Sequence, residues 1–561
     1  MTGVETATVD NCNARPTVKS GYHTRDLFSQ KQAHPGDNMA ETATQVRLPP
    51  GSVPLVTASS TLKVPTPSTD PNDPLNWSMA RKIINTTFVL AVTVAVFAAI
   101  TMQTIFWQQM TVDMNVSFDQ LNWGVAFNSA GLAIGCFLII PLSKKYGRRL
   151  TYVVSTGIMA AVAWWSSQMS TPVEMYLTNF IFGLAGSTNE AISEMTIADL
   201  FFVNQRGTVN GFYIIAVMLG NFIAPTLAGV QAASQGWRWS YKTCAIVLTI
   251  LFVLFMFFYE ETKYIPLSIG SSENVSINLE KLDKNSPPDA KTAPDLEHSF
   301  SSATIPPPNS YRQRLRFFTK TEEPLWRNYL TPLKTGMFPH VLYTGIQCAN
   351  CVLFLVLLSN INSIAFSRPP YNFNTAGVGL MLLGPFVGNI IGSVYGGWFG
   401  DWLIVRLARR NGGIFEPEMR LYILGLPALS MGAGLVVFGV TLDRGLHWIY
   451  PSIGGALFAF GVGSIMDVSC TIVMDTYQNM TAEAFVFITF IRNVACVPIP
   501  FGVVPWMNTM SLTKIFVISG CINTALALLF IPLLVWGRRI RAAMAHKYEA
   551  LLAKVDGVTR A

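Results

Sequence analysis

The chain has 561 residues, of which 51% are hydrophobic and only 13% are charged, and its formal net charge is +7. Soluble proteins carry about 25% charged residues, so this composition excludes an ordinary soluble domain. The basic residues gather in short loops between long apolar segments, which is typical of a membrane protein rather than of a nucleic-acid-binding protein. We therefore expect the lipid bilayer as a partner and no nucleic acid.

The segment before the first apolar run, residues 1–78, is polar and rich in Thr, Pro, Asp and Asn. Such a composition cannot bury enough apolar surface to fold, so we expect a disordered cytosolic tail. The tail ends near Trp77, and Arg81 and Lys82 follow. An aromatic residue beside basic ones is typical of an anchor at the membrane interface.

Twelve apolar segments follow, and each is long enough to cross the hydrocarbon core of a bilayer as a helix. We expect the spans at residues 83–107, 122–143, 150–169, 174–198, 208–231 and 241–259, and then at 336–365, 375–398, 419–441, 446–470, 483–508 and 512–536. The predicted fold is an all-α membrane protein, with twelve transmembrane helices in two pseudo-symmetric six-helix halves at 79–260 and 336–540.

The charges of the loops predict the orientation in the membrane. The loops after the second, eighth and twelfth spans are basic, whereas the loop after the first span carries only the acids Asp113 and Asp119. Basic loops stay in the cytosol, so the linker at 261–335 and the C-terminal tail at 541–561 are predicted to be cytosolic. Asn115, in the sequence Asn-Val-Ser, then faces outward and is a predicted glycosylation site. We expect a multi-pass protein of the plasma membrane.

The fourth predicted span contains two acidic residues. Glu190 and Glu194 lie one helical turn apart and therefore share a face. A carboxylate within a span is costly and usually faces a cavity or a partner, so these two are candidates for carrying protons or binding a cation. The alternative is that both lie near the inner mouth and are merely solvated. Asn189 beside them and Gln103 in the first span are further candidates for the site.

The second half also carries charges within its spans. Asp467 lies in the tenth span, Arg492 in the eleventh, and Asp475 near the inner end of the tenth. Opposite charges in a bundle interior tend to pair, so Arg492 is predicted to form a gate with Asp467 or Asp475. Spacing does not choose between them. Other polar and aromatic residues that could line a cavity are Trp107, Phe127, Asn128, Asn350, Asn360 and Asn389.

Corresponding inner loops of the two halves look alike. Gly147, Arg148 and Arg149 follow the second span, and a Gly-rich segment with Asp401 and three arginines follows the eighth. Such repetition is expected of a duplicated transporter. These loops resemble the signature Gly-x-x-x-Asp-Arg-x-Gly-Arg-Arg of the major facilitator superfamily, with Lys144 where that family has its Asp.

The fifth span contains small residues and one proline. Gly220 and Gly229 allow a neighbouring helix to approach closely, and Pro225 bends the helix between them. The segment resembles the antiporter motif Gly-x-x-x-Gly-Pro-x-x-Gly-Gly of drug:proton antiporters with twelve spans. The stretch from Asp199 to Arg206 is also similar to fungal proteins of this type, in the branch that holds polyamine and histidinol permeases and secondary-metabolite exporters.

The resemblance implies a monomeric, proton-coupled transporter of a small molecule. The antiporter motif favours export of a hydrophobic metabolite or drug, and the aromatic-rich spans suit such a cargo. The alternative is uptake of a polyamine or another cationic nutrient, with Glu190, Glu194 and Asp467 binding the amines. A third reading, a nutrient sensor that does not transport, is disfavoured by the short C-terminal tail.

Because no phosphate-binding loop, nucleophile–base arrangement or metal-ligand spacing is present, we expect no cofactor, no metal site and no enzyme.

Overall fold

The computed structural model describes residues 49–54, 70–264, 309–319, 325–412, 414–477 and 480–559. All of them belong to one compact unit, residues 48–561. Most of the tail that we predict to be disordered, and residues 265–308 and 320–324 of the linker, lie outside the described part of the chain.

The N-terminal half consists of the six predicted helices. They are α1 (Met79–Thr101), continued by a 3-10 turn at Met102–Phe106 and α2 (Trp107–Asp113); α3 (Phe118–Tyr146); α4 (Arg148–Ser166); α5 (Pro172–Leu200); α6 (Val203–Met218), continued by a π-helical turn at Leu219–Ile223 and α7 (Ala224–Gln235); and α8 (Trp237–Phe258).

The C-terminal half repeats this plan. Its helices are α13 (Pro339–Phe366); α14 (Thr375–Leu380), α15 (Leu383–Val394), a π-helical turn at Tyr395–Phe399 and α16 (Gly400–Arg410); a 3-10 stretch at Pro417–Leu424 with α17 (Gly425–Asp443); α18 (Ile449–Thr476); α19 (Thr481–Cys496) with α20 (Pro498–Thr509); and α21 (Leu512–Ala527) with α22 (Phe530–Thr559). Between the halves lie α11 (Tyr311–Arg314) and α12 (Leu325–Thr335).

Ten helical segments of the described chain are long and apolar enough to cross a membrane. The helices α4 and α5 supply the third and fourth spans, and they are less apolar because of residues such as Arg149, Glu190 and Glu194. The prediction of an all-α membrane fold with twelve spans is thus confirmed.

Capping fixes where two of the spans begin. Ser117 accepts the backbone N–H of Gln120, whose side chain accepts the N–H of Ser117 in return, at the start of α3. Thr171 and Glu174 form the same reciprocal pair at the start of α5. Each capping box satisfies backbone groups that would otherwise be unpaired as the helix begins. Gly147, with φ of 116°, ends α3 and lets the chain turn directly into α4.

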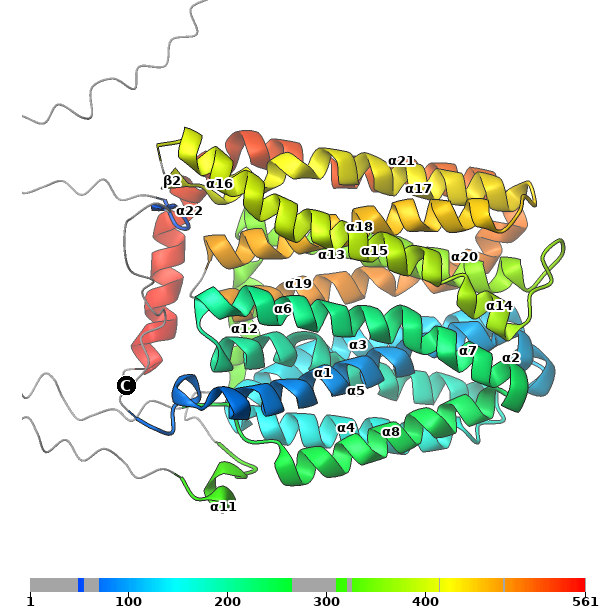
Figure 1. The fold of residues 1–561 in the computed structure, drawn as a ribbon, viewed down its shortest axis with the longest axis horizontal. Helices are drawn as coiled ribbons and strands as arrows, with labels where there is room; N and C mark the ends of the chain where they lie inside the picture. Colours follow the sequence, from blue (N-terminus) through cyan, green and yellow to red (C-terminus); the bar gives the residue numbers. More distant parts are fainter. Residues whose placement is uncertain are drawn as a thin grey trace, which may run out of the picture. The chain divides into compact units, whose positions relative to one another are not determined.

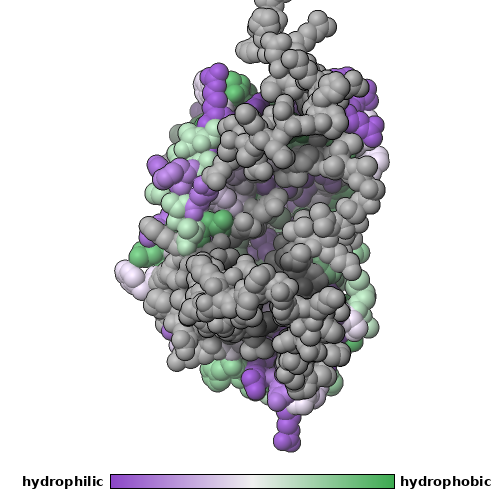
Figure 2. Space-filling model, turned by 90° about the vertical axis from the view of Figure 1, so that its left-hand side faces the viewer, coloured by the Kyte–Doolittle hydropathy of each residue, from purple (hydrophilic) through white to green (hydrophobic). Residues whose placement is uncertain are grey.

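The basic loops gather at one end of the helices, which we call the basic end. It is the left-hand end in Figure 1, where α11, α12, α16 and the C-terminal part of α22 lie, whereas α2 and α14 lie at the opposite end. The N-terminal half, blue to green, and the C-terminal half, yellow to red, lie side by side with their spans roughly aligned. Figure 2 looks onto the basic end, and hydrophilic side chains are visible around it.

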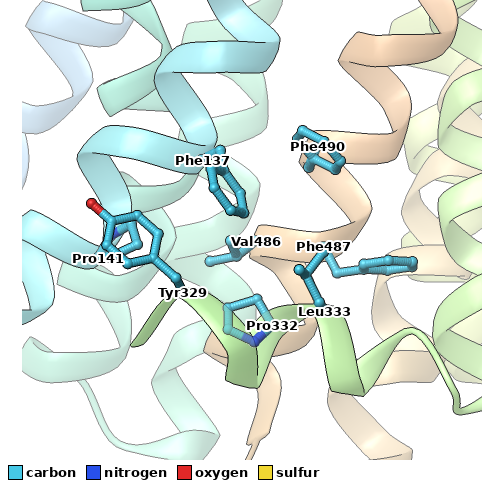
Figure 3. A pocket seen from close by; sticks show the side chains of 8 residues that line it. All are labelled: Phe137, Pro141, Tyr329, Pro332, Leu333, Val486, Phe487 and Phe490. Atoms are coloured by element: carbon cyan, nitrogen blue, oxygen red, sulfur yellow. The ribbon is translucent and has the colours of Figure 1, made fainter. Parts of the chain in front are cut away.

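The linker helix α12 crosses the basic end between the two halves (Figure 1). It packs against both α3 and α19, and a small crevice of about 10 Å³ remains between the three helices. Figure 3 shows its apolar and aromatic lining, which consists of Phe137, Pro141, Tyr329, Pro332, Leu333, Val486, Phe487 and Phe490. The last helix of the linker is therefore packed against the spans where the two halves meet.

Two parts of the predicted tails are ordered as well. Residues Val53 and Pro54 form strand β1, which pairs antiparallel with strand β2 (Ile414–Phe415). The helix α22 continues well past the twelfth span, and its fully buried Arg541 binds both carboxylate oxygens of Glu418 at 2.7 Å. Arg541 also donates to the carbonyl of Pro50 at 2.7 Å, so it holds the N-terminal segment in place.

Replacing Arg541 with Gln should lower the stability of the protein, because Glu418 would keep a buried charge without its partner. Removing one member of a buried ion pair costs about 3–5 kcal/mol. Thermal unfolding of the purified protein in detergent measures the effect. Arg539→Gln is the matched control, since Arg539 is exposed on the same helix. Equal unfolding temperatures for the two variants would contradict this account.

Candidate functional site

A cavity of about 300 Å³ lies between the two halves. Its walls come from α1, α3, α5 and α6 on one side and from α13, α15, α18 and α19 on the other. Most of the lining is apolar, with amides and hydroxyls interspersed. Four charged residues face it, namely Glu190, Glu194, Asp467 and Arg492, and the predicted Asn128, Asn360 and Asn389 line it too.

An ion pair joins the two halves in the wall of this cavity. Arg492 on α19 contacts Glu190 on α5, with 2.5 Å between the guanidinium nitrogen and the carboxylate oxygen. Asn493 donates to the other oxygen of Glu190 at 2.8 Å. The structure therefore corrects the predicted partner of Arg492, which is neither Asp467 nor Asp475. Asp475 instead accepts a hydrogen bond from Arg420 at 2.6 Å, because α18 brings it to the start of the ninth span.

The other two acids of the cavity, Glu194 and Asp467, form no ion pair among the described residues. Glu194 is half-buried, and one of its carboxylate oxygens is buried with no hydrogen-bond partner in the described part of the chain. Asp467 lies close to two glycines. A Cβ atom added to Gly396 would lie 3.1 Å from a carboxylate oxygen of Asp467, and one added to Gly397 would lie 3.4 Å from the same oxygen. A poorly solvated carboxylate without a counter-ion is costly, so each acid has reason to take up a proton or to bind a cation.

Several predicted site residues lie elsewhere. Gln103, Asn189, Trp107, Phe127 and Asn350 are absent from the cavity lining. The side chain of Asn189 accepts a hydrogen bond from Ser193 at 3.0 Å, Asn350 donates to the carbonyl of Asn523 at 3.3 Å, and Gln103 and Trp107 are buried in the N-terminal half. Phe127 stacks on Tyr176 at the surface. Hydropathy places these residues on spans but does not determine which face of each helix meets the cavity.

At the end opposite the basic end, the two halves are in direct contact. Thr226 on α7 donates to the carbonyl of Gly379 on α14 at 2.8 Å. Asn360 on α13 donates to the side chain of Asn122 on α3 at 2.9 Å. These contacts cover the cavity on this side.

Two glycines of the fifth span occupy close helix crossings. An added Cβ at Gly220 would lie 2.7 Å from the Cβ of Phe97 on α1, and one at Gly229 would lie 2.9 Å from the carbonyl oxygen of Thr375 on α14. The π-helical turn Leu219–Ile223 directly precedes the bend at Pro225. Small residues thus permit the seal between α7 and α14, and a larger side chain would push these helices apart.

The signature loops form matching clusters at the basic end. In the N-terminal half, Arg148 at the start of α4 pairs with Asp199 near the end of α5 at 3.3 Å. In the C-terminal half, Arg420 pairs with Asp475 near the end of α18 and with Asp401 at 2.9 Å. Each cluster ties the start of one span to the end of the next at equivalent positions in the two halves. The side chain of Arg206, also a candidate, lies outside the described part of the chain.

The other arginine of the loop between α3 and α4, Arg149, binds backbone carbonyl groups. Arg149 is fully buried and donates to the carbonyls of Tyr259 at 2.8 Å, Met256 at 2.5 Å and Leu315 at 2.5 Å. Glu261 accepts the backbone N–H groups of Arg148 and Arg149. Burial raises the pKa of the Glu261 carboxyl, and these hydrogen bonds oppose the rise. The loop is therefore fastened to the end of α8 and to the linker.

A second ion pair between the halves was not predicted. Lys144 at the end of α3 contacts Glu483 in the first turn of α19 at 2.6 Å. Lys144 occupies the position where the resembled signature has an acid, and its partner is an acid on the opposite half. The lysine in place of the signature's acid was the sequence feature that could have indicated such a pair. Only the fold shows that its partner is Glu483.

Comparison with known proteins agrees with this geometry. The model of the Major Facilitator Superfamily matches residues 88–500. The chain belongs to the major facilitator superfamily. Its relatives place it in the fungal branch that includes drug/proton antiporters, and members of this superfamily are transporters rather than enzymes.

Two relatives and one solved structure illustrate the similarity. An uncharacterized MFS-type transporter of Schizosaccharomyces pombe, C1271.10c, is 28% identical over 87% of this chain and 89% of its own length. The probable drug/proton antiporter YHK8 of Saccharomyces cerevisiae is 23% identical over 78% of this chain and 80% of its own. The structure of the proton:xylose symporter XylE superposes with a TM-score of 0.56 at 14% identity, covering 82% of this chain and 97% of that one. This last likeness supports the fold alone.

Reversing one charge of the Lys144–Glu483 pair should weaken the contact between the halves at the basic end. We expect Lys144→Glu and Glu483→Lys each to lower the unfolding temperature, and the double variant to recover most of the loss. Contacting residues show interaction energies of about 0.5–3 kcal/mol in such cycles. Lys145→Glu is the control, since the side chain of Lys145 makes no ion pair in the described chain. Additive losses in the double variant would rule out the pairing.

Proposed function

We propose that this superfamily member is a proton-coupled transporter that carries a small molecule through the central cavity. One observation carries the proposal. Glu194 from the N-terminal half and Asp467 from the C-terminal half face the same cavity, and neither forms an ion pair in the described chain. A relative named as a probable drug/proton antiporter supports proton coupling.

The ion pairs suggest how the two halves alternate. Glu190 and Arg492 neutralise each other across the interface while Lys144 and Glu483 join the halves at the basic end. Opening the cavity at that end separates both pairs, which costs energy unless solvent or cargo replaces the lost contacts. Proton uptake by the unpaired acids changes the charge of the cavity, and so links its state to the proton gradient.

For the cargo, we infer a small and largely apolar metabolite or drug that is exported. The lining of the cavity is mostly apolar, and its volume of about 300 Å³ lies at the lower end of the roughly 300–1,000 Å³ typical of ligand pockets. Burial of an apolar molecule contributes about 25 cal/mol per Å² removed from water. The similarity to a drug/proton antiporter favours exchange of cargo for protons.

Uptake of a cationic amine is the second candidate, and the charge of the cavity favours it. Three carboxylates face the cavity against one guanidinium, so two negative charges remain when all are ionised. Amides such as Asn389, whose side-chain oxygen has no partner in the described chain, could accept hydrogen bonds from an ammonium group. A polyamine would use these acceptors fully, whereas an apolar cargo would not.

Neutralising the unpaired acids should separate the two candidates. Glu194→Gln and Asp467→Asn are reconstituted in proteoliposomes with an imposed pH gradient, and transport of Nile red, an uncharged apolar dye, and of radiolabelled spermidine is measured. If the cargo is apolar, dye affinity changes little and gradient-driven transport is lost. If the cargo is a polyamine, spermidine affinity itself falls by an order of magnitude or more, because a desolvated charge pair loses one partner.

Asp119→Asn serves as the control, since Asp119 lies in the first turn of α3 outside the cavity. Undiminished gradient-driven transport in both cavity variants would remove these acids from the mechanism and with them the proposal.

We also infer that the basic end faces the cytosol and that Asn115 is glycosylated at the opposite end. Asn115 is exposed between α2 and α3, beyond the acidic end of the first span. A glycosidase should reduce the apparent mass of the wild-type protein but not of Asn115→Gln. A shift that persists in the variant would assign the glycan elsewhere.

Surface biotinylation of intact cells tests the location of the protein. Labelling would place the protein in the plasma membrane, and a lack of labelling would favour an internal membrane.

A further inference from the structure

Two cysteine thiols face each other in the wall of the cavity. The sulfur atoms of Cys348 on α13 and Cys470 on α18 are 3.9 Å apart, both residues line the cavity, and neither is in a disulfide. Cys351 is closer to Cys348 in the sequence, but it is absent from the cavity lining. The fold therefore pairs Cys348 with a cysteine 122 residues away rather than with its neighbour.

The two helices are already in close contact at this point. Thr344, one turn before Cys348, donates to the carbonyl of Ser469, the residue before Cys470, at 2.8 Å. A disulfide needs the two sulfur atoms at about 2.05 Å and the Cα atoms within about 7 Å. The sulfur atoms are 3.9 Å apart, so they must approach by about 1.9 Å to bond, and the neighbouring hydrogen bond from Thr344 to Ser469 keeps α13 and α18 together at this point.

We propose that Cys348 and Cys470 form a reversible oxidation site, which a hydroperoxide converts to a disulfide that restricts opening of the cavity. One thiol, as its thiolate, attacks the peroxide; its sulfur becomes a sulfenic acid, and the cleaved O–O bond releases hydroxide or alkoxide. The second thiol attacks this sulfur, the S–S bond forms, and water leaves. The peroxide is reduced, two thiols are oxidised, and a dithiol reductant reverses the change.

The location of the pair explains why a cross-link would matter. Asp467 lies one turn before Cys470 on the cavity side of α18, and Asn360 lies further along α13, where it contacts Asn122 of the other half. A disulfide fixes the helix that carries Asp467 to the helix that touches the N-terminal half. The two can then no longer rearrange independently when the cavity opens.

The test uses the full-length protein in proteoliposomes, treated with hydrogen peroxide. Peptide mass spectrometry should identify a Cys348–Cys470 disulfide that dithiothreitol removes. Opening of the cavity is read from the rate at which N-ethylmaleimide labels Cys496, which lines the cavity on α19. We expect oxidation to slow this labelling several-fold and reduction to restore it. Neither measurement depends on the identity of the cargo, so failure here is distinct from failure of the proposed function.

Variants decide whether the pair is responsible. Cys348→Ser and Cys470→Ser should each abolish both the disulfide and the slower labelling. Cys521→Ser, at an exposed position of α21, should behave like the wild type. If no Cys348–Cys470 disulfide is found after peroxide treatment, or if peroxide slows labelling equally in either Ser variant, the proposal is wrong.

Discussion

The ion pair between Glu190 and Arg492 is the interaction on which the arrangement of this protein depends. Both charges lie within membrane-spanning helices, where an unpaired ion is costly, and each comes from a different half. Their pairing makes contact between the halves a condition for satisfying both charges. It also engages the guanidinium that faces the cavity, and Glu194 and Asp467 form no ion pair in the part of the chain that the structure describes. One contact thus joins the two halves and occupies two of the four charged residues that face the cavity.

Around this pair, the two halves repeat some interactions and differ in others. Arg148 with Asp199 and Arg420 with Asp475 are equivalent, and each stabilises its own half. Lys144 breaks the symmetry, because it reaches Glu483 on the opposite half. The Arg148–Asp199 and Arg420–Asp475 pairs each lie within one half and need not break when the halves separate, whereas the Lys144–Glu483 pair joins the halves and must break. The basic end therefore holds rigid clusters beside one separable pair.

The sequence was sufficient to predict the spans, because bilayer thickness and backbone hydrogen bonding leave few alternatives for an apolar segment of this length. It also pointed to Glu190, Glu194, Asp467 and Arg492, since charge within a span is rare. It could not predict that Arg492 binds Glu190, because partners on separate helices depend on the rotation and crossing of those helices. For the same reason, the contact of Pro50 with Arg541 has no signal in the local composition of a polar tail.

In the proposed mechanism the acids and the cargo share one cavity, and this constrains the direction of coupling. If a cation binds to the same carboxylates that protons use, the two compete, and competition for one site gives exchange rather than joint movement. Uptake of a cation together with protons would require the acids to divide their roles, with one protonated while the other holds the amine. Glu194 and Asp467 come from different halves, so one of them can hold a proton while the other binds the amine. For an apolar cargo no division is needed, because two protonated acids leave a cavity of low charge that suits it. The charge of the cargo therefore determines which coupling this cavity supports most simply.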